Sequence, residues 1–81
     1  MSVSVLLFAS YADAFGTRRL TVPVDPPCTV SEVVSAMRRM PGGEKLPPRP
    51  LVALNQEWLQ DLEATVSTSD EVAVIPPVAG G

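Results

Sequence analysis

The stretch from Thr29 to Arg39 most constrains what this chain can fold into, because it is the clearest helix in the sequence. Four apolar residues recur at the spacing of one helical face: Val30, Val33, Val34 and Met37. A chain of 81 residues has room for one domain with a small core. The apolar stripe must therefore be buried against strands that the rest of the chain supplies.

Both ends of this helix carry recognisable signals. Thr29 and Glu32 have the spacing of a capping box, and Pro41-Gly42-Gly43 ends the helical pattern. Arg38 and Arg39 fall in the last turn, where cations complement the helix dipole. An anion site at these two arginines is the less favoured alternative.

The segments before the helix predict two strands. Residues 2–9 and 17–24 alternate in side-chain character, and Pro23 makes the second of these an edge strand. Between them, Ser10 is expected to cap a short helical turn that Gly16 ends.

The segments after the helix predict a loop and three strands. Residues 41–50 hold four prolines and two glycines and read as a loop. The strands expected next are residues 51–54, a brief one near Trp58-Leu59, and residues 71–75. Asn55-Gln56 supplies a turn; a catalytic group made by Asn55-Gln56-Glu57 is the less favoured alternative. Strands interleaved with one main helix are typical of an α+β fold.

The last predicted strand runs directly into Pro76-Pro77, after which the chain reaches Gly80-Gly81. Proline has no N–H for a sheet ladder, so strand pairing is expected to stop at Pro76. Six extended residues reach roughly 20 Å. Glycine has no Cβ, so a carboxylate on Gly81 fits a channel too narrow for other residues. We therefore expect a domain at residues 1–75 and an extended tail at residues 76–81.

Composition excludes several classes of function. A net charge of −3 leaves no basic stripe for nucleic acid. Cys28 is the one cysteine and histidine is absent, which argues against metal sites and fits a reducing cytoplasm. A sulfur-relay role for Cys28 is less favoured than a structural one. No signal peptide and no apolar run of about 20 residues is present, so we expect a cytoplasmic protein without membrane contact.

The opposite face of the predicted sheet is also apolar where the last strand ends. If Val5, Val72 and Val74 face the helix, the other face carries Leu6, Phe8, Ala73 and Ile75. A face left in water is normally polar. An apolar face beside the tail predicts a docking surface, unless the turn at 10–15 or a loop covers it.

Three stretches resemble a known family. They are Asp-Glu-Val-Ala-x-x-Pro-Pro-Val-x-Gly-Gly at residues 70–81, residues 5–9 with Gly16, and Ala-Leu-Asn-Gln at residues 53–56. Together they resemble the MoaD/ThiS sulfur carriers, and the MoaD branch in particular. The resemblance implies a ubiquitin-like β-grasp, in which a mixed sheet wraps around one main helix and the first and last strands lie parallel at its centre.

The resemblance also implies a function with several partners. An E1-like adenylating enzyme would use ATP to activate Gly81, which follows Gly80. A sulfur donor of the cysteine desulfurase or rhodanese type would then form a thiocarboxylate. The large subunit of molybdopterin synthase would receive the tail, and sulfur would pass to cyclic pyranopterin monophosphate. Residues expected at that interface are Phe8, Trp58, Ile75, Pro76, Pro77 and Val78. The chain itself would bind no cofactor and act as a substrate-like subunit rather than a free-standing catalyst.

Other functions fit the same tail. A sulfur carrier for thiamine, thiolated tRNA or cysteine synthesis would differ only in the acceptor. A ubiquitin-like modifier would join its terminus to lysines of other proteins. A non-covalent interaction module would leave the terminus inert.

Overall fold

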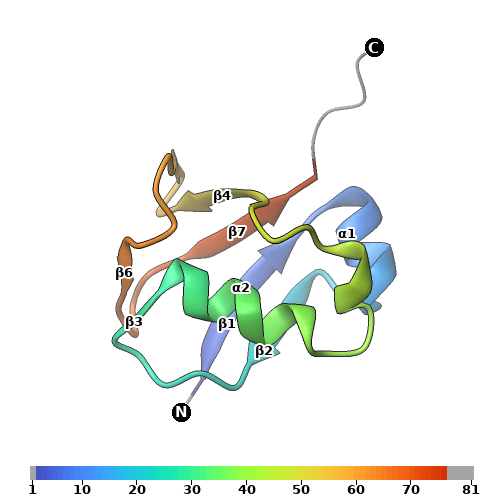
Figure 1. Cartoon of the computed structure of the whole chain (residues 1–81), viewed down its shortest axis with the longest axis horizontal. Coiled ribbons are helices and arrows are strands. Elements are labelled where there is room, and N and C mark those ends of the chain that lie inside the picture. The colour runs from blue at the N-terminus through green and yellow to red at the C-terminus, as the bar shows by residue number, and fades with distance from the viewer. Residues whose placement is uncertain (1, 77–81) are drawn as a thin grey trace.

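The computed structural model describes residues 2–76, which form a five-stranded sheet, a two-stranded ribbon and two α-helices (Figure 1). The strands are β1 (Val3–Leu7), β2 (Arg19–Val22), β3 (Cys28–Thr29), β4 (Leu51–Leu54), β5 (Glu57–Trp58), β6 (Thr65–Val66) and β7 (Val72–Ile75). The helices are α1 (Ala9–Phe15), α2 (Val30–Arg38) and the short 3-10 helix η1 (Gly43–Lys45). Within this part of the chain, each helix is too short or too polar to cross a lipid bilayer.

The five-stranded sheet has the order β2-β1-β7-β4-β5. Its first and last strands in the sequence, β1 and β7, are parallel neighbours, with Leu6 opposite Ala73. β4 pairs antiparallel with β7, so that Leu51 lies opposite Ile75. The parallel central pair and the edge position of β2 confirm the predicted arrangement.

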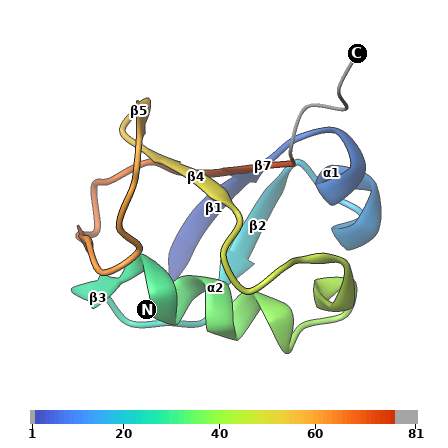
Figure 2. The same cartoon turned by 45° about the horizontal axis from the view of Figure 1, so that its top comes forward.

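The core lies between α2 and one face of the sheet, which we call the inner face (Figure 2). All four residues of the predicted helical stripe are buried. The inner-face residues are buried as well: Val3, Val5, Leu7, Leu20, Val22, Val52, Val72 and Val74. Helix and strand periodicities therefore converge on a single apolar interior.

The predicted capping box of α2 is present. The Thr29 backbone N–H donates to Glu32 Oε1 at 2.8 Å, and the Glu32 N–H donates to Thr29 Oγ1 at 3.1 Å. At the other end, Arg38 Nε donates to the Leu46 carbonyl at 3.1 Å, which gives this arginine a structural role. Gly43 closes the turn, because a Cβ there would meet the backbone of Met37 and Arg38.

The boundary between the first strand and α1 differs from the prediction. β1 ends at Leu7 rather than at residue 9, and the helix begins at Ala9, so Ser10 lies inside α1 and does not cap it. Phe8 holds the N-cap position without a side-chain hydrogen bond, while Gly16 ends the helix with φ of 76° as predicted. The turn depends on Ala9 adopting a positive φ of 49°, which strand alternation does not reveal.

Other short elements were shifted or missed. Pro23 lies just beyond β2, the brief strand is Glu57–Trp58, and β7 begins at Val72. The β3–β6 ribbon, which pairs Cys28 with Val66, and η1 inside the expected loop were not predicted. A two-residue strand is too short to show the alternation of side chains that marks a strand in the sequence. Its pairing is decided by how the rest of the domain packs. The expected tail beyond Pro76 lies outside the described residues.

Candidate functional site

The face of the sheet opposite α2 bears exposed apolar side chains. Phe8 is 45% exposed, Leu51 47% and Trp58 62%. We call this surface the outer patch; its members are Leu6, Phe8, Leu51, Ala53, Trp58, Ala73 and Ile75. Since Phe8 and Trp58 are open to solvent, neither the turn at 10–15 nor any loop among residues 2–76 covers them.

The strand register brings the patch together from distant parts of the sequence. Ala73 lies between Leu6 on β1 and Ala53 on β4, and Trp58 on β5 lies opposite Ala53. These side chains line an open hollow of about 390 Å³, into which Phe8 and Ile75 also face. Gln56 and Glu71 complete its lining and add the polar groups. Three of the predicted partner-binding residues thus share one surface.

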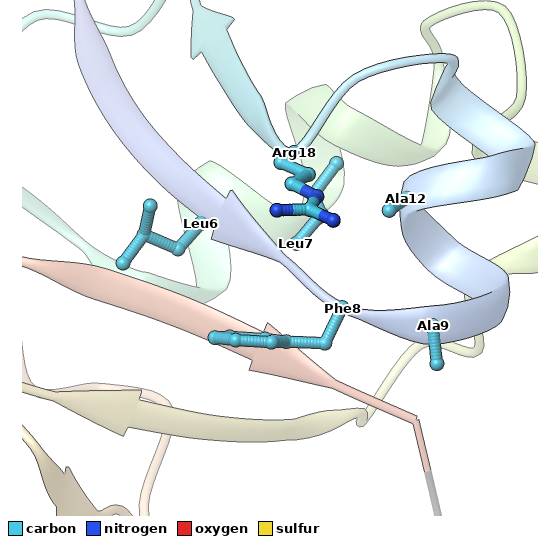
Figure 3. Close-up of a pocket in the computed structure, with 6 residues that line it drawn as sticks. All are labelled: Leu6, Leu7, Phe8, Ala9, Ala12 and Arg18. Atoms are coloured by element: carbon cyan, nitrogen blue, oxygen red, sulfur yellow. The ribbon is translucent and has the colours of Figure 1, made fainter.

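Phe8 is held in the patch by the start of α1. It has extended backbone angles, φ −132° and ψ 151°, and its carbonyl accepts from the Tyr11 N–H at 3.1 Å. Figure 3 shows the Phe8 ring lying flat over the end of β7, away from Ala9 and Ala12. The turn at the end of β1 therefore aims the ring toward the strand that leads to the tail.

Trp58 reaches the patch through a tight hairpin. Asn55 and Gln56 both have positive φ, 52° and 71°, as the favoured two-residue hairpin turns require. This confirms the predicted turn. The Leu59 N–H then donates to the Val52 carbonyl at 2.9 Å, which holds β5 against β4.

Asn55 also fastens this hairpin to the start of β7. Its backbone N–H donates to the Glu71 carbonyl at 2.8 Å, and its Oδ1 accepts from the Glu71 N–H at 2.8 Å. Its Nδ2 donates to Asp70 Oδ1 at 3.0 Å, while the Ser67 N–H donates to Asp70 Oδ2 at 2.7 Å. The pKa of Asp70 is lowered mainly by the hydrogen bond from the Asn55 side chain and, to a smaller extent, by the one from the Ser67 backbone N–H. The sequence pointed to a turn at Asn55 but gave no sign of this clasp.

Leu51, like Ala53, is a patch residue that sequence reasoning missed. It lies opposite Ile75 on β4. Alternation within residues 51–54 could have found it, because Val52 is buried on the inner face and its neighbour must point outward.

Cys28 lies away from the outer patch, in the β3–β6 ribbon. Its thiol is buried, and that burial, reinforced by the carboxylates of Glu32 and Asp25, raises the pKa of Cys28. A neutral buried thiol is a poor nucleophile, so the position supports the structural interpretation. Within residues 2–76, no group of three or more acidic, cysteine or histidine side chains is placed to hold a metal ion.

The end of β7 sets where the tail begins. Ile75 is the last residue of the strand and a member of the outer patch, and Pro76 follows it, half-buried. Figure 1 places the end of β7 beside α1, with which it makes contact. Pro77, Val78, Gly80 and Gly81, the other predicted site residues, lie outside the described residues.

Known proteins share this architecture. A crystal structure of SAMP1 from Haloferax volcanii matches with a TM-score of 0.80 at 28% identity and covers 100% of both chains. The protein–protein complex of subunits 1 and 2 of molybdopterin-converting factor from Helicobacter pylori contains a chain with the same fold, with a TM-score of 0.71 at 20% identity and 100% coverage of both chains. These likenesses confirm the predicted ubiquitin-like β-grasp fold.

The sequence comparisons lead to a family. A molybdopterin synthase sulfur carrier subunit from Arabidopsis thaliana is 32% identical over 82 residues, an alignment that covers 100% of this chain and 84% of the relative. The ThiS family model matches residues 5–81, which include Pro76-Pro77 and Gly80-Gly81. The predicted resemblance is therefore confirmed, and the chain belongs to the ThiS family.

Proposed function

We propose that this chain is the sulfur-carrier subunit of a molybdopterin synthase. The observation that carries the proposal is the position of Ile75, which is both the last residue of the central strand β7 and part of the outer patch. A partner seated on the patch therefore meets the chain where it leaves the sheet. The name of the Arabidopsis relative supports molybdopterin synthase as that partner's enzyme.

Charging of the carrier needs an activating enzyme. A terminal carboxylate has a pKa near 3.5 and is ionised at neutral pH, which makes it a poor electrophile. Transfer of the AMP group of ATP to the Gly81 carboxylate, with loss of pyrophosphate, creates an acyl-adenylate. The terminal sulfur of a persulfide on the donor then displaces AMP and forms an acyl disulfide. A thiol reduces that disulfide, which releases the donor and leaves a thiocarboxylate on Gly81. Gly80 and Gly81 suit this step because neither has a side chain to obstruct the two enzymes.

Discharge occurs on the large subunit. The outer patch docks there, Pro76, Pro77 and Val78 lead into its active site, and the thiocarboxylate gives its sulfur to cyclic pyranopterin monophosphate. Water restores the carboxylate. Because a dithiolene contains two sulfur atoms, two carriers are discharged for each molybdopterin formed. This chain supplies the reactive terminus and the docking surface, and the large subunit supplies the catalytic groups.

Reconstitution with purified partners tests the proposal. The chain is incubated with ATP, an adenylating enzyme, a persulfide sulfur donor and a thiol reductant, and its intact mass is measured. Replacement of one oxygen by one sulfur is expected, followed by molybdopterin formation when the large subunit and its substrate are added. Deletion of Gly81 should abolish both results, whereas S35A, on the exposed side of α2, should change neither. A truncated chain that still makes molybdopterin would refute the role of the tail.

A protein modifier is the second candidate function. The observation that favours it is the likeness to SAMP1, described as a small archaeal modifier protein. A modifier would pass its activated terminus to a lysine amine and form an isopeptide bond. Immunoblots of the native cell against this chain separate the two functions, because a modifier gives a ladder of larger species that disappears when Gly81 is deleted. The identity of the sulfur-containing product likewise separates molybdopterin synthesis from a thiamine, tRNA or cysteine pathway.

A further inference from the structure

A second hollow lies on the same face of the sheet, on the α1 side of Phe8. It has a volume of about 290 Å³. Figure 3 shows the residues that line it: Leu6, Leu7, Phe8, Ala9, Ala12 and Arg18. All but Arg18 are apolar. In Figure 3 the guanidinium of Arg18 lies over the end of β1, between Leu6 and Ala12.

The backbone on both sides holds Arg18 in place. The Leu7 N–H donates to the Arg18 carbonyl at 2.7 Å, and the Thr17 N–H donates to the Ala12 carbonyl at 3.1 Å. The loop between α1 and β2 is thus tied to β1 and to α1, so the arginine leaves the backbone from a fixed position at the rim of the hollow.

The guanidinium of Arg18 has no hydrogen bond or ion pair with any side chain or carbonyl among residues 2–76. Its neighbour differs, because Arg19 Nη1 donates to Ser4 Oγ at 3.4 Å. A cation without a partner among residues 2–76, on a chain of net charge −3, is available to an external anion. Guanidinium groups bind carboxylates through two parallel hydrogen bonds, so the fitting anion is an Asp or Glu side chain.

The two hollows of this face have opposite charges. The hollow between β1, β7 and β5 contains Glu71 and no cation, whereas the hollow beside α1 contains Arg18 and no anion. Both are lined by Leu6 and Phe8, so they adjoin on either side of the Phe8 ring. A partner that covers the outer patch is therefore within reach of the second hollow.

We propose that the hollow beside α1 binds an apolar side chain of the synthase large subunit, and that an adjacent Asp or Glu of that subunit pairs with Arg18. The inference rests on the proposed function, since that function places the large subunit on the outer patch. Arg18 then sets the orientation in which the carrier docks. A charge at the rim of an interface acts mainly through the association rate and its salt dependence.

Binding kinetics with the purified large subunit test this pairing. R18E should slow association and weaken binding by about tenfold or more at low salt, because it sets like charges against each other. R18A should bind with a smaller salt dependence than the unaltered chain. R49E is the matched control: it makes the same change in charge at an exposed position beside Ser31 of α2, away from the outer patch, and should stay within about twofold of the unaltered chain. Thermal unfolding of each variant establishes that it is folded.

Cross-linking identifies the acidic partner directly. R18K keeps the positive charge and supplies an amine that a carbodiimide joins to a carboxylate in contact with it. Mass spectrometry should find position 18 linked to an Asp or Glu of the large subunit, with no such link for R49K at position 49.

Four outcomes oppose the inference. Equal binding by R18E and the unaltered chain, or equal losses for R18E and R49E, would overturn the pairing while leaving the proposed function intact. A bound R18K chain without a link at position 18 would do the same. Failure of the unaltered chain to bind the large subunit would instead overturn the proposed function, and with it this assignment of the hollow.

Discussion

The two faces of the central sheet carry similar apolar residues but differ in their exposure to solvent. On the inner face Val5 and Val74 are 0% exposed beneath α2, whereas on the outer face Phe8 and Trp58 are 45% and 62% exposed. Both faces are apolar, as in sheets covered on both sides. Within residues 2–76, α2 covers the inner face (Figure 2), and the exposure of Phe8 and Trp58 shows that no helix covers the outer one. The outer face is therefore available to a partner protein.

Adjacent residues of β1 and α1 give the largest expected contrast in stability. Leu7 is 2% exposed and Phe8 is 45% exposed. L7A should lower the free energy of unfolding by about 2–5 kcal/mol, because it removes buried methyl groups and leaves a cavity. F8A should lower it by about 1 kcal/mol or less. Urea unfolding of the two variants measures both effects. Equal losses would mean that Phe8 belongs to the core and that the two faces do not differ.

Substitutions on the outer face should affect partner binding more than stability. F8A and W58A should each weaken binding of the large subunit by about 2 kcal/mol, roughly thirtyfold, since exposed aromatic residues are typical interface anchors. T21A, an exposed residue on the edge strand β2, is the control and should bind normally. Isothermal titration calorimetry gives the affinities. Unchanged binding by both aromatic variants would remove the outer patch as the docking site.

The capping box of α2 tests whether stability and partner binding depend on different faces of the domain. T29A removes the side chain that accepts from the Glu32 N–H, and it should cost about 1 kcal/mol of stability. T29S keeps the hydroxyl and should retain most of that stability. Affinity for the large subunit should be unaffected in both variants, because α2 lies on the opposite face. A loss of affinity in T29A at temperatures where it is folded would contradict the separation of the two faces.

The clasp at the start of β7 gives the smallest effect, and it depends on pH. Because hydrogen bonds from Asn55 and Ser67 lower the pKa of Asp70, the charged carboxylate stabilises the fold above the unfolded pKa of about 3.9. That stabilisation is lost as the pH falls through the lower pKa of the folded state. The melting temperature of D70N should therefore lie below that of the unaltered chain at neutral pH, and the gap should close below about pH 4.

D13N serves as the control for this measurement. It removes one negative charge from the exposed side of α1 without touching the clasp. A gap for D70N that persists unchanged at low pH would show that the hydrogen bonds do not depend on the charge of Asp70.

Particular residues show how far sequence reasoning reached. The α2 stripe, its capping box, the Gly16 exit and the hairpin at Asn55-Gln56 were predicted correctly, because each depends on contacts within a few residues. Phe8, Trp58 and Ile75 were also predicted to share a surface, and all three line one hollow.

Most of the features that the sequence did not predict depend on contacts between residues far apart in the chain. Ser10 was expected to cap α1, but the backbone turns at Ala9 instead. The pairing of Cys28 with Val66, the clasp between Asn55 and Asp70, and the position of Arg18 over the end of β1 join residues far apart in the chain. No local pattern encodes such contacts, since each forms only when the sheet is assembled.

Local periodicity and the backbone limits of proline and glycine were enough to predict one helix with one apolar stripe, strands apolar on both sides, and a strand that runs through two prolines to two glycines. Three structural choices required the folded domain: α2 covers one particular face (Figure 2), β7 ends beside Phe8, and the Arg18 guanidinium has no partner among residues 2–76. Those choices depend on strand order and register, which join distant residues and so are settled by packing of the whole domain.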